Sequence, residues 1–200
     1  MRWKDIKLAA MQKMYAAEGS VIPSDESTVD YLAAMPYVAN EGIQMICTSK
    51  KYLIKSVDLN STDGDEMGSY RRYKMSDFVS DFFEFYGEVY YTDSNLHKRS
   101  DDYVTEAQDV FLVPKNLAGI WTVYYKAYPE EITADTEDDY VLPLPPDVSA
   151  ILPLYMASQL YKDDDNGIAT SLRNEFEVAF ERLSQGNPSF LLENDNNGGW

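Results

Sequence analysis

The sequence predicts an α+β fold: a helical bundle formed by the N- and C-terminal segments, with a small β-rich domain inserted between them. Apolar residues recur every three or four positions at both ends of the chain, whereas β-branched and aromatic residues dominate the middle. Helices and strands segregated along a chain in this way are typical of α+β folds. We therefore expect a helical bundle over residues 1–50 and 141–186, a β-rich insert over 51–140, and an extended tail over 187–200.

Two helices are expected in the N-terminal segment. The first covers residues 4–17, whose apolar side chains share one face. The second is predicted by the same spacing between Leu32 and Ile46. Pro36 lies inside this second pattern and cannot donate a hydrogen bond to the preceding turn. This helix is therefore expected to kink at Pro36 or to be two helices.

The middle of the chain is expected to form strands. The stretches KKYLIKSVDL, YRRYKM, EVYYT, DYVTEA, DVFLVP and GIWTVYYKAY combine strand-forming residues with flanking turn residues. The sequence KNLAG, between the last two, is short enough for a hairpin turn. Residues 76–87, SDFVSDFFEFYG, are compatible with a short helix capped by Ser76. Residues 96–102, LHKRSDD, are expected to form an exposed loop.

Two further helices are expected near the C-terminal end. Apolar stripes identify them, with Val148, Ile151 and Tyr155 in one, and Ala169, Leu172, Phe176, Ala179 and Leu183 in the other. Asp147 is expected to cap the first of these helices, and Pro153 to bend it or delay its start.

The sequence between these two helices, DDDNG, raises the question of a metal site. An EF-hand loop starting at Asp163 would need a glutamate at its twelfth position, where Asn174 stands, and its glycine falls one position early. We therefore interpret Asp163–Asp165 as a solvated turn. Its Asp and Asn residues would cap the next helix, and Gly167 would allow a left-handed turn.

Composition restricts the function further. The net charge of −17 makes a DNA reader improbable, and it fits either simple solubility or an acidic passage that nucleic acid crosses without sticking. No apolar run approaches the ~20 residues of a membrane span. Charged residues at Lys4, Asp5 and Lys7 interrupt any signal-peptide pattern, so we expect synthesis in the cytoplasm. Cys47 is the single cysteine, which excludes an intramolecular disulfide and a cysteine-based zinc site.

The sequence offers no convincing catalytic group. His97 is the single histidine and lies in a basic polar stretch, while Cys47 is best explained as a buried structural thiol. Adjacent carboxylates such as Glu130 and Glu131 are common in an acidic chain, and nothing positions a sugar beside them. We therefore predict no catalytic residue, no metal site and no cofactor, and thus no enzyme.

The C-terminal helix pair resembles the closing helices of tailed-bacteriophage neck proteins, the head–tail connector or adaptor proteins, which are related to the tubular tail proteins of short-tailed phages. In that family a helix ending in A-x-x-L-Y precedes an acidic turn and a helix with Asn/Glu-Phe and a final Leu. The matching residues here are Ala157, Leu160, Tyr161, Asp163–Asn166, Glu175, Phe176 and Leu183. The stretches LAAMQKMYAAEG and DYLAAMPYVANEGIQMI suit the family's opening helix pair, so the resemblance covers about half of the chain.

This resemblance implies a structural virion protein located in the neck. Its copies would form a ring of about twelve under the portal protein. The ring would contact tail or other neck proteins. DNA would pass through the ring without being bound specifically, and the protein would not contact a membrane. The family is structural, so it implies no catalytic residue.

Two further hypotheses concern binding. As an alternative function, the β-rich insert would be a binding module, such as a tail or receptor-binding component, that recognises a sugar or a protein through its tyrosines and tryptophan. Ordinary strand packing also explains these aromatic residues. In the tail, Phe190, Leu191, Leu192 and Trp200 are apolar residues within a polar, glycine-rich segment, so we predict that they bind a partner subunit or the next ring.

Overall fold

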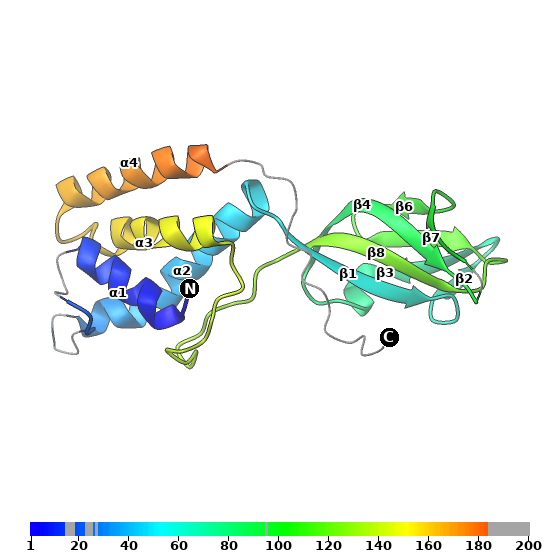
Figure 1. The fold of residues 1–200 in the computed structure, drawn as a ribbon, viewed down its shortest axis with the longest axis horizontal. Helices are drawn as coiled ribbons and strands as arrows, with labels where there is room; N and C mark the ends of the chain where they lie inside the picture. Colours follow the sequence, from blue (N-terminus) through cyan, green and yellow to red (C-terminus); the bar gives the residue numbers. More distant parts are fainter. Residues whose placement is uncertain (15–18, 23–25, 27, 95, 184–200) are drawn as a thin grey trace. The chain divides into compact units, whose positions relative to one another are not determined.

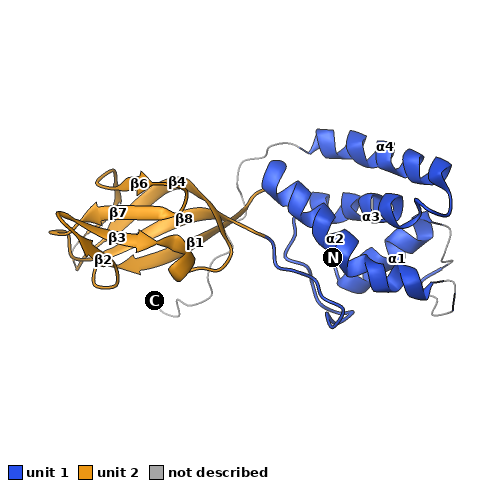
Figure 2. Ribbon diagram, turned by 180° about the vertical axis from the view of Figure 1, so that it is seen from behind, with its two compact units in different colours: residues 1–51, 129–187 blue, residues 52–128, 188–200 orange. Residues whose placement is uncertain are grey.

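The chain forms two compact units, shown in different colours in Figure 2. The computed structural model describes residues 1–14, 19–22, 26, 28–94 and 96–183. The helical unit comprises the described residues of 1–51 and 129–187, and the sheet unit comprises residues 52–128 apart from residue 95. The chain therefore passes from the helical unit into the sheet unit and returns once.

Four helices make up the core of the helical unit as far as the structure describes it: α1 (Trp3–Lys13), α2 (Val29–Ser49), α3 (Pro146–Leu160) and α4 (Asn166–Arg182) (Figure 1). α3 packs against each of the other three helices. This central position follows from its sequence, because α3 carries apolar residues on nearly all sides and such a helix must be covered on several faces.

Two clusters of buried side chains hold these helices together. In the first, Ile46 of α2 meets Val148, Ile151 and Tyr155 of α3 and Phe176 of α4. The second joins Met14, which follows α1, to Ala157 of α3 and Leu172 of α4. The apolar stripe of α4 is buried as its spacing predicts, with Phe176 1% exposed and Leu172 7% exposed.

Pro36 does not divide the second helix. α2 is a single helix of 21 residues that contains Pro36. Proline removes one backbone hydrogen bond. Here Met35, Pro36 and Ala39 are all buried against the rest of the unit, and this packing supports the helix across the missing bond. α1 ends at Lys13, before the predicted end at residue 17, and residues 15–17 lie outside the described part of the chain.

The segment after the sheet unit belongs with the helices although it contains no helix before Pro146. The side-chain amide of Asn40 in α2 donates to the carbonyl of Ile132 and accepts from its N–H, both at 2.8 Å. The N–H of Trp3 donates to the carbonyl of Tyr140 at 2.8 Å. Residues 129–140, which the sequence assigned to the β-rich insert, therefore lie on the helical unit.

Eight strands form two four-stranded antiparallel sheets in the described part of the sheet unit. The first sheet has the order β1-β8-β4-β5, and its strands are β1 (Leu53–Asn60), β8 (Ile120–Ala127), β4 (Phe82–Thr92) and β5 (His97–Ser100). The second has the order β2-β3-β7-β6, with β2 (Asp65–Met67), β3 (Tyr70–Lys74), β7 (Val110–Pro114) and β6 (Val104–Glu106). A short 3₁₀ helix, Met75–Asp77, follows β3.

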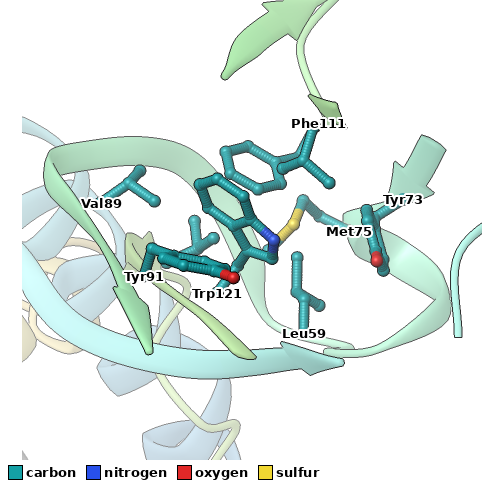
Figure 3. Close-up of a cluster of buried hydrophobic side chains, with 9 residues drawn as sticks. Leu59, Tyr73, Met75, Val89, Tyr91, Phe111 and Trp121 are labelled. Atoms are coloured by element: carbon teal, nitrogen blue, oxygen red, sulfur yellow. The ribbon is translucent and has the colours of Figure 1, made fainter. Parts of the chain in front are cut away.

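Side chains from both sheets meet in one core (Figure 3), which makes the unit a β-sandwich. Trp121 of β8 lies at its centre, with Tyr91 of β4 at a ring distance of 4.8 Å and Phe111 of β7 at 6.3 Å. Leu59 of β1 and Tyr73 of β3 complete the core from opposite sheets. These side chains belong to both sheets, so the two sheets share one core.

Three local predictions in this region are wrong. Residues 82–87 are not helical but begin β4, in which Phe82, Glu84 and Phe85 pair with residues of β8. A bulge between Phe85 and Val89 disturbs the register of this strand, and Gly87, at φ 71°, supplies the positive backbone angle that the bulge contains. The expected loop at residues 96–102 contains β5, which pairs with β4. β7 and β8 are not a hairpin, since they belong to different sheets.

The predicted fold class, an α+β helical bundle with a small β-rich insert, is wrong as stated. The molecule consists of four described helices and two antiparallel sheets, and the β-sheet domain is the main feature of the middle of the chain. Its eight strands enclose a core of their own, so it is a full domain and not a small addition to a bundle. Short strands such as β2, β5 and β6 carry little apolar alternation, so the size of the domain could not be inferred from the sequence.

None of the described helices is both long enough and apolar enough to cross a membrane.

Candidate interaction surface

The acidic turn between α3 and α4 is held by hydrogen bonds within the protein. Asp165 is the N-cap of α4, and its Oδ1 accepts from the N–H of Ile168 at 3.0 Å. Asp164 Oδ2 accepts from the hydroxyl of Tyr31. Asp163 is exposed. No group of three His, Cys, Asp or Glu side chains in the described residues is arranged to hold a metal ion.

Two details of the predicted caps are wrong. Gly167 is not in a left-handed turn but lies in the first turn of α4, where the helix has already begun at Asn166. Asp147 does not cap α3, because the helix begins at Pro146 with Pro145 as its N-cap. Instead, the carboxylate of Asp147 forms an ion pair with Lys51 at 2.9 Å, which joins the start of α3 to the end of α2.

The two candidate reactive side chains both have structural surroundings. Cys47 is 1% exposed in α2, and burial raises the pKa of its thiol to about 12, which leaves it protonated and unreactive at neutral pH. His97 lies on β5, where its Nδ1 is 2.7 Å from the hydroxyl oxygen of Thr92 and its ring stacks on Tyr90. Within the described part of the chain, these surroundings of Cys47 and His97 include no acid or base positioned to activate either side chain.

An open apolar groove runs between α3 and α4. These helices lie side by side (Figure 1) and are joined by the acidic turn. The groove has a volume of ≈ 770 Å³. Its apolar lining comes from both helices and from the residue that follows α4: Ala150, Ile151, Leu154, Val178, Ala179 and Leu183. Val178 is 53% exposed, so a large part of an aliphatic side chain faces solvent there.

The rim of the groove is polar and carries both signs of charge. Asp147 and Arg182 lie at the end of the groove where α3 begins and α4 ends. Ser171 and Glu175 lie closer to the start of α4. Asp147 is already paired with Lys51. Arg182 forms no ion pair with any residue that the structure describes. An apolar floor with a polar rim is the usual organisation of a surface that binds another chain.

A second surface with recognition chemistry lies on the outer face of the first sheet. We call it the tyrosine face, and it consists of Tyr90, Tyr124 and His97. The rings of Tyr90 and His97 are stacked at 5.4 Å, and Tyr90 and Tyr124 meet edge to face at 6.1 Å. A hydrogen bond to Glu88 is the main cause that raises the pKa of Tyr90. Among the other aromatic residues of EVYYT and GIWTVYYKAY, Trp121, Tyr91 and Tyr125 are buried, whereas Tyr128 is 40% exposed.

The four apolar tail residues predicted to bind a partner, Phe190, Leu191, Leu192 and Trp200, lie outside the described residues. The α3/α4 groove was not predicted. Val178 is the one large apolar residue in a stripe that also contains Ser171, Glu175 and Arg182, so this side of α4 looked like a solvated face. The sequence of α3 could have indicated the groove. Its apolar residues surround the helix, so more than one of its sides must be packed against other residues.

No protein-family model matches the chain, and no curated protein sequence matches it. The resemblance of the helix pair to phage neck proteins therefore rests on the residues quoted for it.

Proposed function

We propose that the chain is a structural protein of a tailed-bacteriophage virion, a neck connector made in the host cytoplasm. Its copies form a ring under the portal protein that joins the head to the tail or to other neck proteins and lets DNA pass. The observation that carries this proposal is the open apolar groove between α3 and α4, the same two helices that resemble the neck family. An apolar surface left open in one chain is a reason to assemble with others.

The positions of the family-like residues support a structural role. Ala157, Phe176 and Leu183 are buried at 0%, 1% and 7% exposure, where they hold α3 and α4 together. Leu160 and Tyr161 stand at the end of α3, immediately before the acidic turn. These residues therefore fix the geometry of the helix pair and of the groove on its surface. A protein that works by assembly needs a fixed shape of this kind and no reactive group.

The charge of the chain supports the passage of DNA. A net charge of −17 over 200 residues gives a surface that repels phosphates. Proteins that hold DNA do so by releasing its counterions with Lys and Arg, and this chain has 17 such residues against 34 Asp and Glu. A ring made from these subunits would let DNA slide through, because attraction to the wall would slow its exit.

Assembly of the purified chain tests the proposal. Negative-stain electron microscopy and native mass spectrometry, applied over a range of concentrations up to about 100 µM, are expected to show closed rings of one size. Virions that carry the protein are expected to contain it in an amount equal to one ring per particle, measured by quantitative mass spectrometry. A chain that stays monomeric at every concentration and is absent from purified particles would contradict the proposal.

A second function is favoured by the tyrosine face, which would make the sheet unit a module that binds a sugar or a protein. Stacked rings of Tyr90 and His97 present a planar surface, and Glu88 and Arg99 beside them form an ion pair at 2.5 Å that supplies hydrogen-bonding groups. The comparison is between Tyr90→Ala and Tyr128→Ala on a glycan array, since Tyr128 is 40% exposed and lies outside this face. Glycan binding lost only with Tyr90→Ala would favour this function, and no binding by the parent chain would exclude a sugar ligand.

A further inference from the structure

We propose that the α3/α4 groove is the acceptor for the C-terminal segment of a second copy of this chain, with Phe190, Leu191 and Leu192 entering it. This inference deepens the proposed ring function, because it names the contact between neighbouring subunits. It rests on the groove, on the residues that follow α4, and on the way the chain leaves that helix.

The groove needs a cover that the described residues do not provide. Ala150 and Val178 are both exposed within it, and Ile151 and Leu154 line it from α3. An isolated exposed valine is ordinary, but here it belongs to a continuous apolar hollow of ≈ 770 Å³. A few large apolar side chains are the natural occupant of such a hollow, because their burial and that of its walls both remove apolar surface from water.

The chain itself contains such an occupant. Residues 184–200 follow the last described residue and read SQGNPSFLLENDNNGGW. Phe190, Leu191 and Leu192 are a run of three large apolar residues in a segment that is otherwise polar or glycine-rich up to Trp200. A segment of this composition cannot bury enough surface by itself, so its apolar run is most useful against a preformed surface.

The conformation at the end of α4 favours binding of the C-terminal segment to the groove of another copy and not to its own. Leu183 has φ −58° and ψ 109°, an extended conformation, instead of the left-handed one that commonly reverses the chain after a helix. Leu183 is also 7% exposed and fills the end of its own groove. The six residues 184–189 span up to about 20 Å when extended, which is enough to reach a neighbouring subunit.

Donor and acceptor on one chain suit a closed ring. The segment and the groove are different surfaces, so their contact is heterologous, and a heterologous contact repeated with a closing rotation gives a ring. The charges of the segment and of one end of the groove are complementary. Residues 184–200 contain Glu193 and Asp195 and no Lys or Arg, and Arg182 on the rim has no ion-pair partner among the described residues.

Complementation between two full-length variants tests the inference. Val178→Glu places a charge in the groove and leaves the segment intact. A triple variant, Phe190→Ser with Leu191→Ser and Leu192→Ser, removes the apolar run and leaves the groove intact. Val29→Glu is the matched control, because Val29 lies on α2 of the same unit, is 53% exposed like Val178, and does not line the groove. Ala150→Glu is a second groove variant, at another exposed position.

Sedimentation velocity is expected to show self-association of the parent chain and of Val29→Glu, weakened by about tenfold or more in each groove or segment variant. An equimolar mixture of Val178→Glu and the triple variant is expected to form a heterodimer that grows no further, because the mixture contains one working groove and one working segment per pair. Each variant is first checked for parental circular dichroism, which shows that it folds.

Absence of the heterodimer in that mixture would overturn the inference. A lower melting temperature of the triple variant at high dilution, with unchanged association, would also overturn it by placing the segment in the groove of its own chain. Rings formed equally by both variants would leave the proposed neck function intact and exclude this contact. A heterodimer without any ring from the parent chain would give the opposite result, with the contact supported and the ring function refuted.

Discussion

The hydroxyl of Tyr31 donates a hydrogen bond to Asp164, which lies 133 positions later in the chain, and so joins the first turns of α2 to the turn between α3 and α4. The rings of Tyr31 and Tyr161 also meet, at a centroid distance of 6.5 Å. Asp164 of the acidic turn is therefore bound to α2, although the sequence offered no reason to distinguish it from Asp163 and Asp165.

Replacing Tyr31 by Phe is expected to destabilise the protein by about 1 kcal/mol at neutral pH, because the hydrogen bond to Asp164 is lost. Burial, followed by this hydrogen bond, raises the pKa of Tyr31 to about 12 from 10.0. Both folded and unfolded states hold the phenol proton below pH 10, so the contribution of the contact is complete there. Between pH 10 and 12 only the unfolded state releases the proton, and the contribution is lost as pH rises.

Urea unfolding of the parent chain and Tyr31→Phe, compared from about pH 8 to pH 11, measures this effect. The stability difference between the two is expected to shrink above pH 10. Tyr37→Phe is the control, since Tyr37 lies on the same helix and is 78% exposed. A difference that stays constant over the whole pH range would show that Tyr31 does not titrate in this way.

Asp165→Ala is expected to cost about 1 kcal/mol of unfolding free energy, because Asp165 caps α4 through the N–H of Ile168. Asp163→Ala is expected to change stability very little, since its carboxylate is exposed. Thermal or urea unfolding of the two variants gives the comparison. Equal losses in both would mean that the turn is stabilised by its total charge and not by the cap.

Calcium is expected to leave the melting temperature unchanged. A ligand that binds only the folded state must raise this temperature, and the described residues contain no cluster of three ligating side chains. Differential scanning calorimetry with and without millimolar calcium provides the measurement. A calcium-dependent rise that disappears in Asp163→Asn would restore the metal interpretation of the acidic turn.

Phe176→Ala is expected to destabilise the helical unit by about 2–5 kcal/mol, the usual cost of removing a buried aromatic or large aliphatic side chain. Phe176 is 1% exposed and meets Tyr155 edge to face at 5.2 Å. Val178→Ala, two positions later and 53% exposed, is expected to cost less than about 0.5 kcal/mol. The reverse order of these two losses in urea unfolding would place the wrong face of α4 in the core.

DNA is expected to bind the purified chain weakly or not at all, since a charge of −17 opposes the counterion release that drives non-specific binding. Fluorescence anisotropy with a labelled duplex at about 50 mM salt is a sensitive measurement. Nanomolar affinity that falls steeply with added salt would be incompatible with an acidic passage.

The parts of the fold that the sequence predicted well are those where one apolar stripe determines what is buried. In α4, Ala169, Leu172 and Phe176 recur at helical spacing and all three are buried. β8 is a strand as predicted, but its aromatic residues on both faces did not show which face is buried, and the structure buries Trp121, Val123 and Tyr125 between partly exposed neighbours.

Prediction failed for segments whose structure depends on a neighbouring strand, and for a surface that the chain itself leaves uncovered. β5 reads HKRS, a sequence with no apolar alternation, and it is a strand because β4 supplies its hydrogen bonds. The start of β4, with Phe82, Phe83 and Phe85, is compatible with the spacing of a helix and with that of a strand. Only its pairing with β8 decides between them. The α3/α4 groove escaped prediction for a related reason, since the sequence does not show which side of an apolar helix the rest of its own chain leaves open.

The chain enters and leaves the sheet unit through paired neighbours, because Leu53 at the start of β1 lies opposite Ala127 at the end of β8. Opposed residues in antiparallel strands have Cα atoms only about 5 Å apart, so the first and last strand residues of the sheet unit are close neighbours. A domain attached in this way can be cut out and replaced by a short glycine linker, or exchanged for another domain, without changing the path of the helices. Replacement of residues 52–128 is therefore expected to leave the helical residues on either side packed against one another.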